Sequence, residues 1–272
     1  MSDTHASPPG DDAGEVVRYE ELGPIARITL NRPRARNAID AAVSAGLEAA
    51  IDRLDASDGV WAAVLAAAPT PDRPVFCAGA DLKAIDAGEA RGIHTKKGGF
   101  AGFVFRERVK PIVACVDGLA TAGGCEIVLA CDVVVASTRS AFGMAEVKRN
   151  LVANAGGLFR LPRAVGPSVA MEMALTGEPL PARRAYELGL VSRLVEPHEA
   201  MATALSIART IAGNGPLSVQ ATRRIVAAAF SEDDETLTRR GYDASRLMFS
   251  TEDTVEGVRA FIEKRAPRWQ GR

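Results

Sequence analysis

Short, continuous apolar runs separated by helix-like stretches constrain the fold of this chain more than any other feature. Three such runs, 60–68, 112–116 and 133–136, show no alternation of polar and apolar residues. Runs of this kind are typical of strands buried on both faces of a parallel sheet, with a buried helical turn as the alternative. A fourth run, 26–30, ends in the turn signal Asn-Arg-Pro. The pattern therefore favours an α/β (α+β) core with crossover connections.

Apolar residues at helical spacing occupy much of the remaining chain. From Val43 to Leu54 they recur at intervals of four, four and three, which predicts one face of an amphipathic helix. After residue 197 every apolar pattern is helical, and Ser250 and Thr251 are candidate caps of the last helix. The length of 272 residues is compatible with about two domains. We expect a disordered tail over 1–14, a core over 15–197 and a helical C-terminal region over 198–272.

The charge balance argues against several classes of partner. The chain has 33 Lys and Arg residues and 34 Asp and Glu residues, so its net charge is −1. Proteins that bind nucleic acid or anionic membranes usually carry a basic excess, so we expect neither partner. No apolar run approaches the ~20 residues of a membrane span, and residues 1–14 lack the apolar stretch of a signal peptide. The sequence thus predicts a cytoplasmic protein.

Histidine and cysteine patterns give no support to a metal or nucleophile site. The three histidines lie in no H-E-x-x-H motif and near no G-x-S-x-G motif. The four cysteines form no C-x-x-C pair and have small or apolar neighbours, which predicts buried free thiols. We therefore expect no metal ion and no redox cofactor.

Two glycine-containing segments follow strand-like runs and precede helix-like sequence. They are 76–83 (FCAGADLK) and 117–126 (DGLATAGGCE), and neither is a G-x-G-x-x-G or P-loop motif. Small residues let a ligand approach the backbone, and free N–H groups at a helix start favour negative charge. Two such segments facing each other would form an oxyanion hole. Two tight strand-to-helix turns without a ligand are the alternative.

Two glutamates accompany these segments. Glu126 comes two residues after the paired glycines, and Glu146 comes twenty residues later, with the strand-like run 133–136 between them. Each could simply complement a helix dipole as a first-turn acid. If both point into one pocket, their repulsion raises the pKa of one carboxyl above that of the other. Such an acid and base acting on a water molecule suit its addition to a double bond.

These segments, taken in order, resemble the enoyl-CoA hydratase/isomerase (crotonase) superfamily over roughly residues 15–267. The resemblance rests on their joint order and spacing. The matching stretches are Asn31-Arg32-Pro33 with Asn37-Ala38, residues 78–83, 111–132, Phe142-Gly143 with Glu146, residues 155–157, 185–191 and 261–265. The resemblance implies a crotonase-like spiral of ββα turns that carries the active site. It also implies a C-terminal helical oligomerisation region that assembles homotrimers, or hexamers as dimers of trimers.

The same resemblance implies roles for four site residues. The backbone N–H groups of Ala80 and Gly123 would hold the thioester oxygen of an acyl-CoA. Glu126 would hold and activate water for attack at the β-carbon, and Glu146 would exchange the proton at the α-carbon. Relatives that act as isomerases often keep only the second glutamate, so the presence of both favours a hydratase.

Further positions match the segments that bind coenzyme A in relatives. Coenzyme A is then part of the substrate rather than a cofactor. For every cation among these positions, a solvated surface charge is the alternative. The expected substrate-binding residues are Arg34, Arg36, Ala38, Ala78, Asp81, Leu82, Lys83, Gly124 and, from a neighbouring subunit, Lys264.

The sequence departs from the family pattern at three places. Ala122 stands where many relatives have a glycine, and its small side chain should be tolerated. Val152 and Asn154 occupy a commonly Gly- and Pro-containing loop that helps to place the water. The segment 88–102, with His94, matches nothing strongly and is expected to form the variable wall of the acyl pocket.

The resulting hypothesis is a trans-2-enoyl-CoA hydratase that produces a 3-hydroxyacyl-CoA, as in fatty-acid or related acyl-CoA metabolism. An enoyl-CoA isomerase, or another CoA-thioester enzyme of the same fold, is the nearest alternative. A non-catalytic CoA- or RNA-binding protein is the alternative from a different class.

Overall fold

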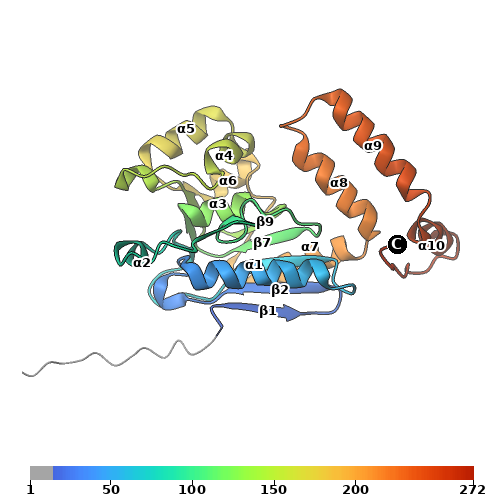
Figure 1. The fold of residues 1–272 in the computed structure, drawn as a ribbon, viewed down its shortest axis with the longest axis horizontal. Helices are drawn as coiled ribbons and strands as arrows, with labels where there is room; N and C mark the ends of the chain where they lie inside the picture. Colours follow the sequence, from blue (N-terminus) through green and yellow to red (C-terminus); the bar gives the residue numbers. More distant parts are fainter. Residues whose placement is uncertain (1–14) are drawn as a thin grey trace, which may run out of the picture.

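The computed structural model describes residues 15–272, so the expected tail over 1–14 lies outside the described residues. The larger sheet has the strand order β1-β2-β3-β7-β9-β12. Only the β1–β2 pair is antiparallel, and every other pair in this sheet is parallel (Figure 1). The strands are β1 (Val17–Glu21), β2 (Ile25–Leu30), β3 (Ala62–Ala67), β7 (Ile112–Val116), β9 (Val133–Ser137) and β12 (Arg193–Val195).

The four apolar runs of the sequence are strands β2, β3, β7 and β9, which confirms the prediction of a buried parallel sheet. Helix α1 (Ala41–Ala56) packs on one face, and α7 (Ala200–Ala212) packs on the other. Alternate residues of β3 divide between the two faces: Leu65 joins the α1 side and Val64 the α7 side. Alanines at every fourth position of α7 bring this helix close to the sheet.

A second sheet of four strands has the order β11-β10-β8-β4. Strands β4, β8 and β10 run parallel, and β11 is antiparallel to β10. The sequence patterns did not identify β8 or β10, because a strand of three residues shows no periodicity. The strands are β4 (Val75–Cys77), β8 (Leu119–Thr121), β10 (Ala141–Gly143) and β11 (Leu180–Pro181).

The chain adds one strand to the larger sheet and one to the second sheet, and then forms a helix. One turn contains β3, β4 and α2 (Leu82–Asp86), and the next contains β7, β8 and α3 (Gly123–Leu129). Strands β9 and β10 repeat the step and lead through the 3-10 helix η2 (Glu146–Arg149) to α4 (Gly157–Val165) and α5 (Pro167–Thr176). This is the expected spiral of ββα turns in a mixed α/β fold. The remaining short elements are η1 (Pro33–Ala35), β5 (His94–Thr95), β6 (Gly99–Phe100), α6 (Ala182–Leu188) and η3 (Pro197–Glu199).

The last three helices project from the core (Figure 1). They are α8 (Pro216–Ala228), α9 (Asp234–Met248) and α10 (Glu252–Ile262). Thr251 caps α10 as expected, because its hydroxyl accepts the N–H of Thr254. Of residues 15–272, no helix is both long and apolar enough to cross a membrane. Three of the four free cysteines are buried, and Cys131 is half-buried.

A buried asparagine connects the segment after β2 to the neighbouring strands by hydrogen bonds. Asn37 is 1% exposed, and its Nδ2 donates to the carbonyl oxygens of Ala68 at 3.0 Å and Val75 at 3.2 Å. Its Oδ1 accepts the N–H of Arg32 at 3.1 Å. Asn37 also has a φ of 52°, which asparagine tolerates better than alanine. This side chain thus places the segment 36–39 next to the end of β4.

We expect Asn37→Ala to lower the free energy of unfolding by about 3 kcal/mol, since three hydrogen bonds are lost and two carbonyls stay buried. Urea denaturation measures this change. Asn31→Ala, which removes one side-chain bond to the carbonyl of Glu15, serves as the control and should cost less than about 1 kcal/mol. Equal losses in the two variants would show that Asn37 does not have this role.

Candidate active site

A cavity of about 460 Å³ lies where strands β4, β8 and β10 end. These strands are parallel, with one register shift in β4 between Val75 and Cys77; beyond it Cys77 pairs with Ala120, and Ala120 with Phe142. The chain therefore leaves all three strands at the same edge of the sheet. Strand β4 is followed by the turn before α2, strand β8 by α3, and strand β10 by η2. Ala80, Gly123, Glu126 and Glu146, the expected catalytic residues, all line this cavity, which is the candidate catalytic cavity.

The two glycine-containing segments meet, as the oxyanion-hole hypothesis requires. A Cβ atom built on Gly79 would lie 3.0 Å from the backbone nitrogen of Gly123. Gly79 has a φ of 86°, so a glycine serves both the turn and the close approach. Within residues 15–272, the N–H groups of Ala80 and Gly123 have no acceptor. Both N–H groups are therefore free to bind one oxygen atom.

The backbone beside Gly123 is closely packed. A Cβ atom on Gly123 would lie 2.4 Å from the ring of Phe100, so a larger residue there displaces the ring or the backbone. The preceding residue, Ala122, has φ 52° and ψ −130°, a conformation that favours glycine. The small side chain of Ala122 fits, but the turn that orients the Gly123 N–H stores strain.

Glu126 is 3% exposed and lies in the first turn of α3. Its Oε1 accepts the N–H of Gly157, at the N-terminus of α4, at 2.9 Å. Burial raises the pKa of Glu126 to about 7, and the charge of Glu146 acts in the same direction. The hydrogen bond from Gly157 opposes this rise. Glu126 is thus a carboxyl group whose proton is exchangeable near neutral pH.

Glu146 begins η2, directly beyond the end of β10. Burial raises its pKa, and the nearby charge of Arg149 lowers it in part. The Oε2 atom of Glu146 is buried and has no hydrogen-bond partner within residues 15–272. An unpaired buried carboxylate oxygen is costly and commonly marks a functional group. The two glutamates therefore form an electrostatically coupled pair at one cavity.

The segment matched to coenzyme A binding in the sequence lies alongside the oxyanion segment. Residues 36–39 pair with 78–81: Ala78 donates to the carbonyl of Arg36 at 3.1 Å, and Ile39 donates to that of Gly79 at 2.8 Å. Arg34, Arg36, Leu82 and Lys83 are exposed, whereas Ala38 is buried. The side chains of Ala78 and Leu82 line the cavity.

Seven of the nine expected binding residues do not line this cavity: Arg34, Arg36, Ala38, Asp81, Lys83, Gly124 and Lys264. Asp81 caps α2 and accepts Nη1 of Arg32 at 3.0 Å. Burial opposes ionisation of Asp81, but hydrogen bonds from Arg32 and Ala84 hold its pKa below the usual value. A Cβ on Gly124 would lie 2.2 Å from the carbonyl oxygen of Cys77, so this glycine lets α3 approach β4. Lys264 follows α10, far from α2 (Figure 1).

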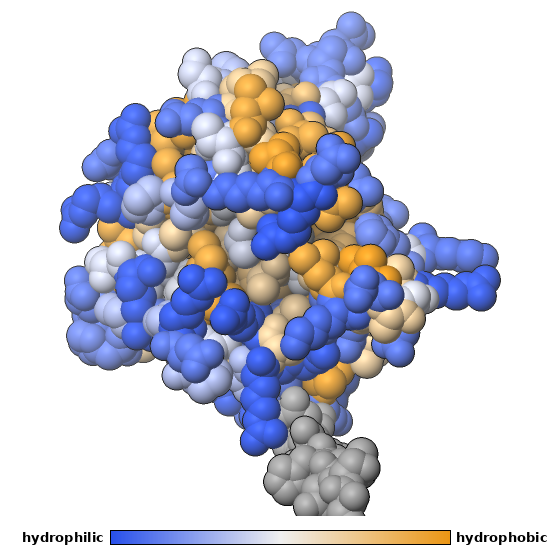
Figure 2. Space-filling view, turned by 90° about the vertical axis from the view of Figure 1, so that its left-hand side faces the viewer, coloured by the Kyte–Doolittle hydropathy of each residue, from blue (hydrophilic) through white to orange (hydrophobic). Residues whose placement is uncertain are grey.

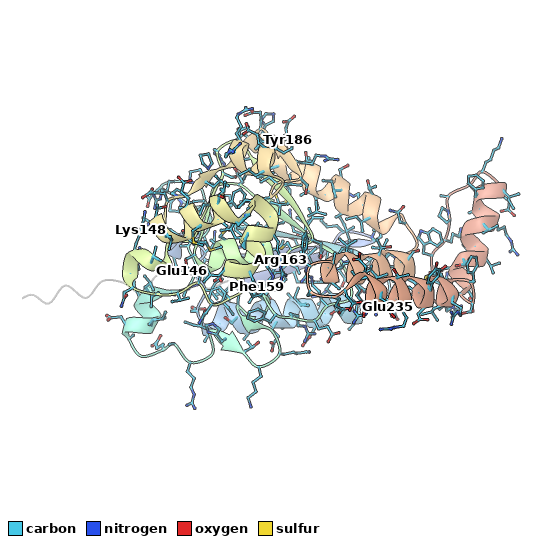
Figure 3. The ribbon with its side chains drawn as sticks, turned by 90° about the horizontal axis from the view of Figure 1, so that it is seen from above. Glu146, Lys148, Phe159, Arg163, Tyr186 and Glu235 are labelled. Carbon is cyan, nitrogen blue, oxygen red and sulfur yellow. The ribbon has the colours of Figure 1, made fainter. Side chains whose placement is uncertain are left out.

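The structure adds residues that the sequence patterns did not reveal. Arg73, Lys148 and Arg149 line the cavity, whereas His94 and Phe100 line it from the segment 88–102, which was expected to form a pocket wall. The two cations two and three residues after Glu146 are a signal that could have been noticed. The Nζ of Lys148 pairs with Glu178 at 2.7 Å. In Figure 3, Glu146 and Lys148 lie at the opposite end of the molecule from Glu235 on α9.

Comparisons with known proteins agree with this geometry. The family model "Enoyl-CoA hydratase/isomerase" matches residues 20–272, and the chain belongs to this family. A crystal structure of an enoyl-CoA hydratase from Mycobacterium tuberculosis H37Rv is 44% identical, with a TM-score of 0.89, over 95% of this chain and 100% of that chain.

Curated relatives include enzymes with other acyl groups in their names. A mevalonyl-coenzyme A hydratase of Aspergillus fumigatus is 40% identical over 89% of this chain and 90% of its own length. A carnitinyl-CoA dehydratase of Salmonella arizonae is 36% identical over 94% of this chain and 99% of its own length. Both the hydratase and the dehydratase activity are thus represented among similar proteins.

The raised pKa of Glu126 predicts a pH-dependent contribution to stability. The pKa is about 7 in the folded protein and 4.5 ordinarily, so between these values the unfolded chain releases a proton that the folded chain keeps. The stability of the wild type relative to Glu126→Gln should therefore be greatest below pH 4.5 and fall by about 3 kcal/mol as the pH rises to 7.

Urea denaturation of both proteins across this pH range measures the effect. Glu235→Gln, in the exposed first turn of α9, is the matched control for the loss of a surface carboxyl. A wild-type-minus-Gln difference that stays constant over this range would contradict a raised pKa of Glu126.

Proposed function

We propose that this protein is a hydratase that adds water to the double bond of a trans-2-enoyl-CoA and yields a 3-hydroxyacyl-CoA. The observation that carries the proposal is the cavity shared by two free N–H groups, the buried carboxyl of Glu126 and the half-buried carboxyl of Glu146. The hydratases and dehydratases among the similar proteins support it, and the Ala80 and Gly123 donors need no metal ion to polarise the carbonyl.

The thioester oxygen accepts the N–H groups of Ala80 and Gly123. As water attacks the β-carbon, the thioester becomes enolate-like and negative charge builds on this oxygen. Each donor is worth roughly 3 kcal/mol in such a transition state. Because both donors belong to the backbone, a side-chain change at either position acts through shape.

The two glutamates divide the proton transfers. Glu126 enters ionised and takes a proton from the water whose oxygen bonds to the β-carbon. Glu146 enters protonated and gives its proton to the α-carbon. The pair thus holds one proton before and after the reaction, and the reverse sequence removes water. Burial raises the pKa of both carboxyls, and the charge of Glu146 raises that of Glu126 further, which supports a pair that retains a proton more readily than exposed carboxyls do.

Coenzyme A binds, in this proposal, along the segments 34–38 and 78–83, with the exposed cations of these segments near its phosphates. Lys264 would serve the site of another subunit. Exposed apolar side chains on the projecting helices, including Val226, Phe230 and Phe261, support a homotrimer or a hexamer. A groove of about 880 Å³ between α4 and α8, lined by Phe159 and Arg163 (Figure 3), has room for side chains of a second copy.

Glu126→Gln and Glu146→Gln should each lower kcat for hydration of crotonyl-CoA by 10²–10⁴-fold, about the contribution of general acid–base catalysis. Glu146→Gln should also abolish deuterium exchange at the α-carbon in heavy water. Glu187→Gln, which changes an exposed glutamate of α6, is the control for the loss of a carboxyl group. Wild-type hydration rates in both glutamine variants would contradict the proposal. Faster double-bond migration in a 3-enoyl-CoA than hydration would instead identify an isomerase.

Gly123→Ala should reduce kcat/KM by about 10²-fold, since the added methyl group displaces an N–H donor against the ring of Phe100. Adding Phe100→Ala should recover part of the loss by giving the methyl group space. Steady-state kinetics of the two single variants and the double variant measure the coupling. Additive losses would contradict steric displacement as the cause.

A further inference from the structure

A second cavity, of about 420 Å³, lies between η2, α4 and α5. Among residues 15–272, Glu146 is the only ionisable residue that lines it, and no aromatic ring does. Several of its apolar side chains are exposed although they are large, among them Val152 and Leu175, each 69% exposed. Apolar patches that soluble proteins expose often mark binding surfaces. The apolar residues that line this cavity are Met144, Val147, Leu151, Val152, Ala153, Leu158, Leu161, Pro162, Pro167, Ala170, Met171, Ala174 and Leu175.

This apolar cavity adjoins the catalytic cavity. Glu146, Leu151 and Val152 line both. The buried Oε2 atom of Glu146, a residue that the two linings share, has no hydrogen-bond partner within residues 15–272. Figure 2 views the side of the molecule that carries α2 and α5, and apolar side chains are exposed there among polar ones. A ligand whose reacting carbons lie beside Glu146 therefore meets an apolar space next to them.

We propose that this apolar cavity receives the acyl chain beyond the β-carbon, and that the substrate class is an acyl-CoA with an unsubstituted hydrocarbon chain of medium length. This inference rests on the proposed function, because the thioester must lie at Ala80 and Gly123 for its tail to pass Glu146.

The lining chemistry selects against polar acyl groups. Hydroxyl and charged substituents would lose water without gaining a hydrogen-bond partner among the apolar lining residues. A quaternary ammonium is commonly recognised by aromatic faces, which this cavity lacks. This chain should therefore differ in acyl preference from the carnitinyl-CoA and mevalonyl-CoA enzymes to which it is similar.

Binding of saturated acyl-CoAs tests the cavity without requiring any reaction. Calorimetry with butanoyl-CoA and octanoyl-CoA should give dissociation constants that differ by about 250-fold, since each of the four extra methylenes contributes about fourfold. In Ala174→Phe, whose ring fills the cavity from α5, this ratio should fall below about tenfold. Ser168→Phe places the same ring on α5 outside the cavity lining and should keep the wild-type ratio.

Leu175→Asp provides a second test at an exposed position of the same wall, where a change of fold is not expected. A charge there should also reduce the ratio. A wild-type ratio near one, or an unchanged ratio in both cavity variants, overturns the assignment. A change in oligomer mass by light scattering with an unchanged ratio also overturns it, and would identify the cavity as a contact between copies.

The same ligands separate this inference from the proposed function. A large ratio for saturated acyl-CoAs, reduced in Ala174→Phe, supports the cavity even if no enoyl-CoA is hydrated. In that case the hydratase proposal fails, and the assignment of the apolar cavity to the acyl chain is retained. Conversely, if crotonyl-CoA is hydrated but butanoyl-CoA and octanoyl-CoA bind with similar dissociation constants, the hydratase proposal is supported. The assignment of the apolar cavity to the acyl chain is then overturned.

Discussion

The candidate site depends on the parallel register of three short strands. Strands β4, β8 and β10 lie side by side in one sheet and end at the same edge, so segments separated by some twenty to forty residues begin beside one another. The N–H of Ala122 donates to the carbonyl of Gly143 at 2.9 Å and extends this alignment beyond the strands. If the register shifted by one residue, the side chains of a strand would change faces and the two glutamates would separate.

Burial of two carboxyl groups at this edge has an electrostatic cost that the surrounding backbone reduces only in part. The N-terminus of α4 donates to Glu126, while Oε2 of Glu146 has no such partner within the described residues. The pKa of each carboxyl is raised as a result. The same desolvation that destabilises the folded protein raises the pKa of Glu126 to about 7, and general acid–base chemistry is most effective when the pKa lies near the working pH. Stability and reactivity are therefore opposed at this position.

The sequence by itself determined the elements with a clear period and the resemblance that orders them. The buried strands of the large sheet, the apolar face of α1 and the cap of α10 follow from local patterns, because a period of several residues and a capping side chain are local properties. The order of the glycine-containing segments and the two glutamates also predicted which residues share a site.

Tertiary structure alone decided how these parts meet. Strands of three residues carry no period, so β8 and β10 and their register appear only when the chain is folded. The contact of Phe100 with Gly123, the strained φ of Ala122 and the cations Arg73, Lys148 and Arg149 at the cavity depend on approaches between distant segments. The cavity between η2, α4 and α5 likewise exists only through packing, because the volume between helices is set by side chains that no single segment contains.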